Sequence, residues 1–212
     1  MVLQRKLCVS LFALSTAMLV GQATATVILP QNLEQLESQA QLVFVGICTT
    51  RTATTDERGV PVNVFTFEVI EPVKGNLKKG NRIEVRQFGN DAPNAKGFAV
   101  RIPGVPNYPI GRKVLLFLNP PSKIGLTAPV GLSQGVFLVE QNVEGKEVIR
   151  LDPLRRKLLV GKMNVAGYVQ TGRFTAAEVA MLSNPPESVE LPAFCSLVRK
   201  LAQERERMTK PK

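Results

Sequence analysis

The sequence predicts a mainly β protein, with one antiparallel β-barrel or β-sandwich, a short helix before it and one or two helices after it. Three observations support this fold class. About six to eight short apolar or alternating stretches are separated by turns that contain glycine or proline. Helical periodicity occurs only near the two ends of the chain. The hydrophobic fraction of 44% and the charged fraction of 21% are ordinary for a globular protein.

Residues 1–25 have the three zones of a secretory signal peptide. Arg5 and Lys6 give a positive start, residues 7–20 are almost wholly apolar, and Ala23–Ala25 places small residues at a cleavage site. A membrane-spanning helix needs about 20 apolar residues, so this run is too short for a permanent anchor. We therefore expect an exported product, periplasmic or secreted, that begins at Thr26 and has no membrane span.

The first elements after the signal peptide change from a helix to strands. Asn32–Ala40 has leucines spaced for one helix face, and Asn32 can cap this helix. Leu42–Cys48 is a compact apolar strand. In Val62–Ile70 the side chains alternate between two faces. The face that we expect to lie in the core carries Phe65, Phe67 and Val69.

A long loop separates the next two strands. Arg82–Arg86 alternates cleanly, with its two aliphatic side chains pointing inward, as on a half-solvated antiparallel sheet. The stretch from Gly89 to Gly111 holds four glycines and four prolines, which predicts a loop. Loops of this length are often functional. Val114–Leu118 is uniformly apolar, so we expect it to be a central strand.

Two hairpins are expected before the chain returns to helix. Residues 135–140 and 146–150 flank a Glu-Gly turn and predict the first hairpin. Residues 157–160 and 164–169 predict a second hairpin across Gly161.

Helical periodicity returns near the C-terminus. Thr175–Glu178 is a capping box. A further helix is expected to begin near Pro192, a favourable first-turn residue, and its apolar face carries Phe194, Leu197, Val198 and Leu201. The chain therefore divides into a signal peptide (1–25), a β domain (26–170) and a helical appendage packed on that domain (171–212).

Several short segments form an ordered set between Val43 and Val139. They are Val45–Gly46, Val73–Gly75, Pro103–Tyr108, Gly111–Leu118 and Gly131–Phe137. In order and spacing, this set resembles an uncharacterised family of exported bacterial proteins. The early Phe-Val-Gly strand, the Lys-Gly turn and the late Leu-Leu-Phe-Leu strand also resemble, more distantly, netrin and tissue metalloproteinase-inhibitor domains. That resemblance implies an OB-like antiparallel β-barrel.

The same distant resemblance supplies one alternative function, inhibition of an extracellular protease. The tissue inhibitors chelate the protease zinc through a cysteine at the mature N-terminus. Thr26 is expected at that position here, so the mechanism does not carry over, and inhibition stays an analogy based on fold.

The absence of histidine excludes several chemistries. Ser-His-Asp catalysis, Cys-His catalysis and His-ligated zinc all need imidazole. No G-x-S-x-G, S-x-x-K or glycine-rich nucleotide motif occurs in the chain. We therefore expect no catalytic residues, no metal and no cofactor.

One enzymatic alternative depends on carboxylates, because a hydrolase needs only two acidic groups at a suitable separation. Glu68 and Glu84 fall in two neighbouring predicted strands. Both alternate out of phase with the apolar residues, so we expect them on a solvated face. A carboxylate-dependent hydrolase is thus the second alternative function.

Two cysteines remain after the signal peptide is removed, Cys48 and Cys195. In an oxidising compartment this pair predicts a disulfide. The alternative is two separately buried thiols, each acting as a small hydrophobic side chain.

The remaining signal is a basic charge balance. The formal net charge of +10 falls by two with the loss of Arg5 and Lys6. Such a charge favours anionic partners, although export argues against nucleic acid. A cluster of cations is one interpretation and scattered solubilising charge the other; the residues concerned are Arg82, Arg86, Arg101, Arg112 and Lys113.

We therefore expect an exported non-enzymatic binding module that acts on a protein or an anionic cell-envelope polymer through the loop from Gly89 to Gly111. The binding residues expected in and beside this loop are Tyr108, Arg101 and Arg112. Tyr108 is predicted as an exposed anchor, because aromatic side chains with a polar tip suit interfaces. The alternative is a buried tyrosine that plugs the end of the barrel.

Overall fold

The computed structural model describes residues 29–89, 99–100 and 102–209. The predicted signal peptide, residues 1–25, lies outside these described residues. In chain order the elements are α1 (Leu33–Gln39), β1 (Leu42–Thr55), β2 (Pro61–Lys74), β3 (Arg82–Phe88), β4 (Lys113–Leu118), the 3₁₀ turn η1 (Leu132–Gly135), β5 (Val136–Gln141), β6 (Glu147–Arg150), α2 (Pro153–Val160), α3 (Val165–Gln170), α4 (Ala176–Ser183), β7 (Ser188–Glu190) and α5 (Leu191–Thr209).

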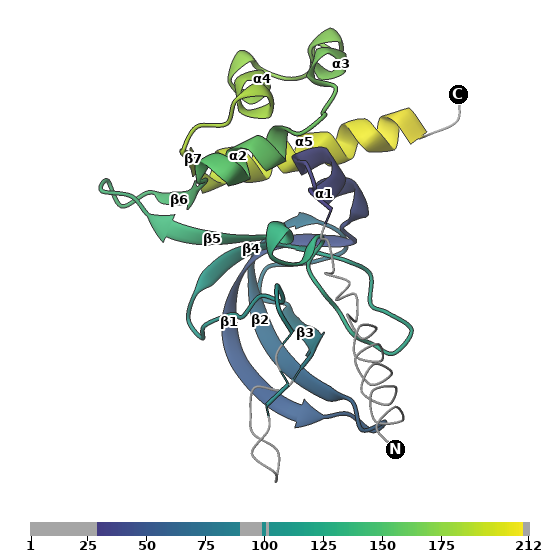
Figure 1. The fold of residues 1–212 in the computed structure, drawn as a ribbon. Coiled ribbons are helices and arrows are strands. Elements are labelled where there is room, and N and C mark those ends of the chain that lie inside the picture. The colour runs from purple at the N-terminus through teal and green to yellow at the C-terminus, as the bar shows by residue number, and fades with distance from the viewer. Residues whose placement is uncertain (1–28, 90–98, 101, 210–212) are drawn as a thin grey trace, which may run out of the picture.

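Seven antiparallel strands form one sheet in the order β3-β2-β1-β4-β5-β6-β7. Figure 1 shows β1 and β2 as long curved strands, with the helices gathered over the β5–β7 end. β3 and β7 stand at opposite ends of the order, so among the described residues the sheet is open. The mainly β class is confirmed, but the closed barrel expected from the sequence is not observed.

The uniformly apolar strands are buried on both faces. One face of the sheet packs against the helices through a helix-side cluster, to which β1 and β4 contribute Val43, Val45, Leu115 and Phe117. The opposite face holds an inner cluster, made by Phe44, Cys48, Phe65, Phe67, Val69, Val85, Tyr108, Val114, Leu116 and Leu118. Alternate residues of β1 and β4 therefore point into different cores, and the central position predicted for Val114–Leu118 is confirmed.

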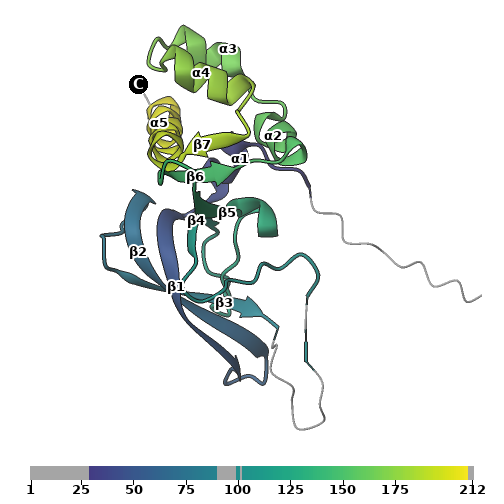
Figure 2. The same cartoon turned by 90° about the vertical axis from the view of Figure 1, so that its left-hand side faces the viewer.

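β-Bulges curve the long β1–β2 hairpin. The register between the two strands shifts at three places, between Val43 and Phe44, between Val45 and Gly46, and between Cys48 and Thr50. Bulges bend a strand and increase its twist. A Cβ atom at Gly46 would lie 2.8 Å from a carbon of the Phe44 ring, so glycine is required where the bend brings the two together. The curved hairpin leans away from the helices (Figure 2).

Helices α1 and α5 cover the helix side of the sheet. The Asn32 side chain accepts a hydrogen bond from the Gln35 amide at the start of α1, as expected of an N-cap. The capping box of Thr175 and Glu178 at the start of α4 is also confirmed. In α5 the expected apolar face is buried, and it comprises Phe194, Leu197, Val198 and Leu201.

The second predicted hairpin is wrong, because residues 157–160 end α2 and residues 165–169 belong to α3. Asp152 caps α2 and Pro153 occupies its first turn, while Asn164 caps α3 through the Gly167 amide. Short apolar runs fit a buried helix or a strand equally well. Here the capping side chains stabilise the helical conformation.

The expected division at residue 170 does not separate strands from helices. α2 and α3 precede it, and β7 follows it and pairs with β6, with Val189 opposite Ile149. The segment expected to be a helical appendage therefore supplies the last strand of the sheet.

Buried carboxylates connect α4 and the preceding turn to α5. Arg173 lies 2.6 Å from Glu204, and Lys200 lies 2.7 Å from Glu178. Burial alone would raise the pKa of Glu204, but hydrogen bonds from Arg207 and Arg173 outweigh it and hold the pKa below its ordinary 4.5.

We expect this lowered pKa to make the free energy of unfolding fall as the pH becomes acidic. A carboxylate whose pKa is lower in the folded state stabilises the fold above the ordinary pKa, and that contribution is lost as the pH falls through the folded-state pKa. Urea unfolding at about pH 6 and about pH 3.5 should show a lower midpoint at the acidic pH. Glu204→Gln should reduce this difference, and an unchanged difference would contradict the assignment.

Candidate functional site

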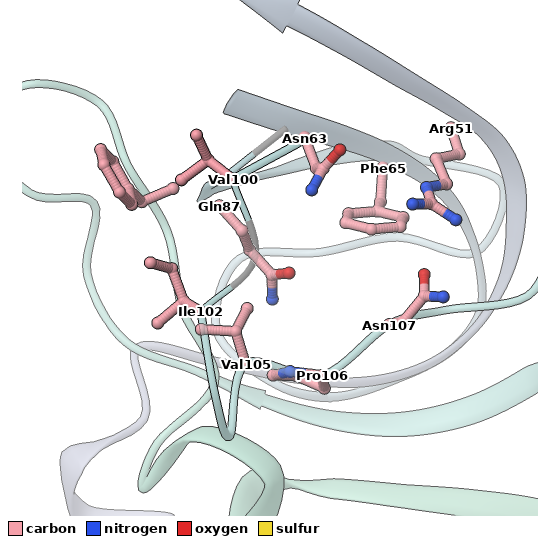
Figure 3. A pocket seen from close by; sticks show the side chains of 11 residues that line it. Arg51, Asn63, Phe65, Gln87, Val100, Ile102, Val105, Pro106 and Asn107 are labelled. Carbon is pink, nitrogen blue, oxygen red and sulfur yellow. The ribbon is translucent and has the colours of Figure 1, made fainter. Parts of the chain in front are cut away.

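A pocket of about 320 Å³ opens on the inner side of the curved strands, and we call it the Gln87 pocket. β1, β2 and β3 form one wall, and Val100, Ile102 and residues 105–107 form the other (Figure 3). Its lining residues are Arg51, Asn63, Phe65, Gln87, Phe88, Gly89, Val100, Ile102, Val105, Pro106 and Asn107.

The floor of the pocket is a fixed carboxamide. Gln87 lies on the inward face of β3, in phase with Val85, and only 3% of its surface is exposed. Its Nε2 donates a hydrogen bond of 3.1 Å to the Tyr108 hydroxyl. The Tyr108 ring packs edge-on against Phe65 and Phe67, with centroid distances of 4.9 and 5.0 Å. Because these contacts hold Tyr108 in place, Gln87 is held as well.

The expectation that Tyr108 is exposed is wrong. Its side chain is buried in the inner cluster, and burial raises the pKa of its phenol well above the ordinary 10. Tyr108 is buried because its ring packs against the two phenylalanines of β2. The alternative of a buried tyrosine is correct in that respect, but the described sheet is open and offers no barrel end to plug.

The mouth of the pocket is polar on one side and apolar on the other. The Arg51 guanidinium lies 5.6 Å from the centre of the Phe65 ring, and the Asn107 side chain is exposed opposite it. Val100 and Ile102 are more than one-third exposed and form the apolar side. The pocket thus offers hydrogen-bonding groups beside an aliphatic surface.

The two arginines expected to bind are not gathered at this pocket by the described structure. Arg101 lies outside the described residues. Arg112 is exposed, does not line the pocket, and its amide donates to the Pro109 carbonyl. Arg86 and Lys113 lie on β3 and β4, with β2 and β1 between them, so the described cations of the expected cluster are spread over the sheet.

The glutamates of the hydrolase alternative lie on neighbouring strands, as expected, and face solvent. Glu68 stands opposite Arg82 in the register of β2 and β3, and Glu84 stands opposite Thr66. Both side chains are exposed in an open hollow away from the Gln87 pocket. Within the described residues, no three His, Cys, Asp or Glu side chains form a group that could hold a metal ion.

The predicted disulfide is not formed. Cys48 lies in the inner cluster and Cys195 in the helix-side cluster, so the sheet separates two buried free thiols. Burial raises the pKa of both, that of Cys195 to about 12. The alternative of two separately buried thiols is the one observed.

We expect iodoacetamide to leave both thiols unmodified in the native protein and to modify both in urea. Native labelling should be slower by a factor of at least about 100, because it requires opening of the core. Mass spectrometry of the two cysteine-containing peptides measures the rates. A Cys48–Cys195 peptide in a non-reduced digest would contradict the prediction.

Sequence reasoning missed Gln87 and Asn63 as site residues, although the pattern contained a signal for both. Each is a polar residue in the inward phase of its strand, Gln87 beside Val85 and Asn63 beside Phe65. Buried polar groups need hydrogen-bond partners. A polar residue on the inward, otherwise apolar side of a strand therefore indicates a candidate site residue.

Comparisons with known proteins do not identify the chain. No family model matches it, and no curated protein matches it. The resemblance to an exported bacterial family stays a prediction. Of the helices that the structure describes, none combines the length and apolar character that a membrane span requires.

Proposed function

We propose that the protein is an exported, non-enzymatic binding module and that the Gln87 pocket takes a segment of a protein partner. The observation that carries this proposal is the combination of a buried carboxamide floor with an exposed aliphatic rim. In ligand sites a few fixed polar groups orient the ligand, and apolar surface beside them is covered by it.

The chemistry of the lining supports binding over catalysis. Among the described lining residues the one ionisable side chain is that of Arg51. General acid–base catalysis needs a group that exchanges protons near the working pH, and a guanidinium stays charged. The groups at this pocket can orient a ligand by hydrogen bonds and apolar contact.

The shape of the apolar surface favours a peptide over a cell-envelope polymer. Of the rings at or beside the pocket, those of Phe65 and Tyr108 are almost completely buried and cannot stack on a sugar ring, and Phe88 is exposed at the rim. Phe88, Val100 and Ile102 together make an apolar rim that complements apolar side chains of a peptide.

Two isoleucines on the same segment allow a matched test. Ile102 lines the pocket, whereas Ile110 is also exposed and does not. Peptides selected from a displayed random library on the immobilised protein should bind Ile102→Asp at least about tenfold more weakly than the wild type. They should bind Ile110→Asp normally. Equal binding to both variants, with thermal unfolding unchanged, would overturn the pocket as the binding site.

Export is tested separately. Residues 1–25 fused to a reporter enzyme that is active only outside the cytoplasm should produce activity, and the fused segment should be removed after Ala25. An inactive reporter with the segment still attached would overturn export while leaving the binding proposal intact.

A further inference from the structure

We infer that the carboxamide oxygen of Gln87 accepts a hydrogen bond from a main-chain N–H of the bound peptide, with an aliphatic side chain beside that N–H packed on the rim. This inference rests on the proposed function, because it names the group that the pocket recognises.

One end of the carboxamide is already used. Nε2 donates to the Tyr108 hydroxyl, and the T-shaped contacts with Phe65 and Phe67 fix the Tyr108 ring. The Gln87 side chain therefore has little freedom to turn, and its Oε1 atom has a defined direction.

The other end faces the pocket. Gln87 lines the pocket although it is only 3% exposed, and no hydrogen bond joins its Oε1 to another of the described residues. Figure 3 shows the amide directed into the space bordered by Phe65 and Asn107.

An acceptor held at the bottom of a pocket selects a ligand that can donate. Covering it with a group that cannot donate leaves a desolvated polar atom, which is costly. Asn107 lies across the pocket with an exposed amide that can both donate and accept. A peptide unit offers an N–H and a C=O together and so complements Gln87 and Asn107.

The rim determines what accompanies that peptide unit. Val100, Ile102 and Val105 border the floor with aliphatic surface. A β-branched or leucine side chain next to the N–H would cover this surface and exclude water from the hydrogen bond. The recognised class is therefore an aliphatic peptide segment with a free main-chain N–H.

Two probes that differ in one donor test this inference on the full chain. N-acetyl-valyl-valine N-methylamide carries the N–H between its valines, and the matched depsipeptide has an ester oxygen there. Binding is followed by NMR through the side-chain amide signals of Gln87 and Asn107. The amide probe should bind about tenfold more tightly than the ester, which is the effect of one hydrogen bond to a buried acceptor.

Two variants distinguish a Gln87 that binds the peptide from a Gln87 that only holds Tyr108 in place. Gln87→Met keeps the side-chain length and removes the acceptor, so the preference for the amide over the ester should disappear. Tyr108→Phe removes the hydrogen bond that holds Gln87 but keeps the Oε1 acceptor, so the preference should weaken without disappearing. If Gln87 only supports Tyr108, both variants will behave alike, and the inference is wrong.

The outcomes also distinguish this inference from the proposed function. If both probes bind at the pocket with equal affinity, the N–H assignment fails and the binding module stands. If neither probe perturbs pocket signals while the methyl glycoside of N-acetylglucosamine does, the peptide as occupant is overturned, and the proposed function with it.

Discussion

Phe67→Ala is expected to lower the free energy of unfolding by about 3–5 kcal/mol. Phe67 is completely buried at the centre of the inner cluster, where it packs edge-on against Tyr108 and Phe44. Removing the ring leaves a cavity that curved strands on one side and Tyr108 on the other cannot fill. Urea unfolding followed by circular dichroism measures the change.

Phe88→Ala is the matched control for Phe67→Ala. Phe88 is 42% exposed at the end of β3, so its loss should cost about 1 kcal/mol or less. If the two substitutions proved equally destabilising, the inner cluster would not be the core that its burial indicates.

Glu37→Gln is expected to cost about 3 kcal/mol, the second-largest effect of a single substitution. The Glu37 carboxylate is 1% exposed and lies 2.9 Å from Lys74 Nζ and 3.1 Å from Arg205 Nε. It thereby joins α1, the end of β2 and α5. The substitution keeps the shape of the side chain but leaves two cations, one of them largely buried, without their counter-charge.

An exposed glutamate provides the comparison for Glu37. Glu144 pairs with Lys146 at 3.2 Å in a solvent-exposed turn, where such pairs contribute about 0.5 kcal/mol or less. Glu144→Gln should therefore leave the urea midpoint almost unchanged. A similar small shift for Glu37→Gln would show that the ion pairs of Glu37 contribute little to holding α5 on the fold.

The strands of the inner cluster could be predicted because their pattern and their environment agree. Phe65, Phe67 and Val69 alternate with solvated residues, and the uniformly apolar β4 is buried on both faces. Where apolar runs were short, as in α2 and α3, periodicity did not separate helix from strand. The capping side chains of Asp152 and Asn164 carried the missing information.

The open sheet and the pocket could not be predicted from the strands alone. Closure depends on whether the first and last strands of the order meet, and β7 lies in the part of the chain that we expected to be a helical appendage. The pocket depends on how β1, β2 and β3 curve together toward the segment that follows β3. The sequence places Gln87 on the inward side of its strand, but the direction of its carboxamide follows only from the contact with Tyr108.

The double burial of β4 has a consequence for the unfolded chain. Val114–Leu118 is five consecutive apolar residues with no charge among them, which is the composition of segments that self-associate as cross-β aggregates. Arg112 and Lys113 precede this run, and Pro120 and Pro121 follow it closely. Charged residues and prolines that flank an apolar strand oppose its aggregation. The residues that make this strand central in the folded molecule thus limit the concentration at which the chain refolds without precipitating.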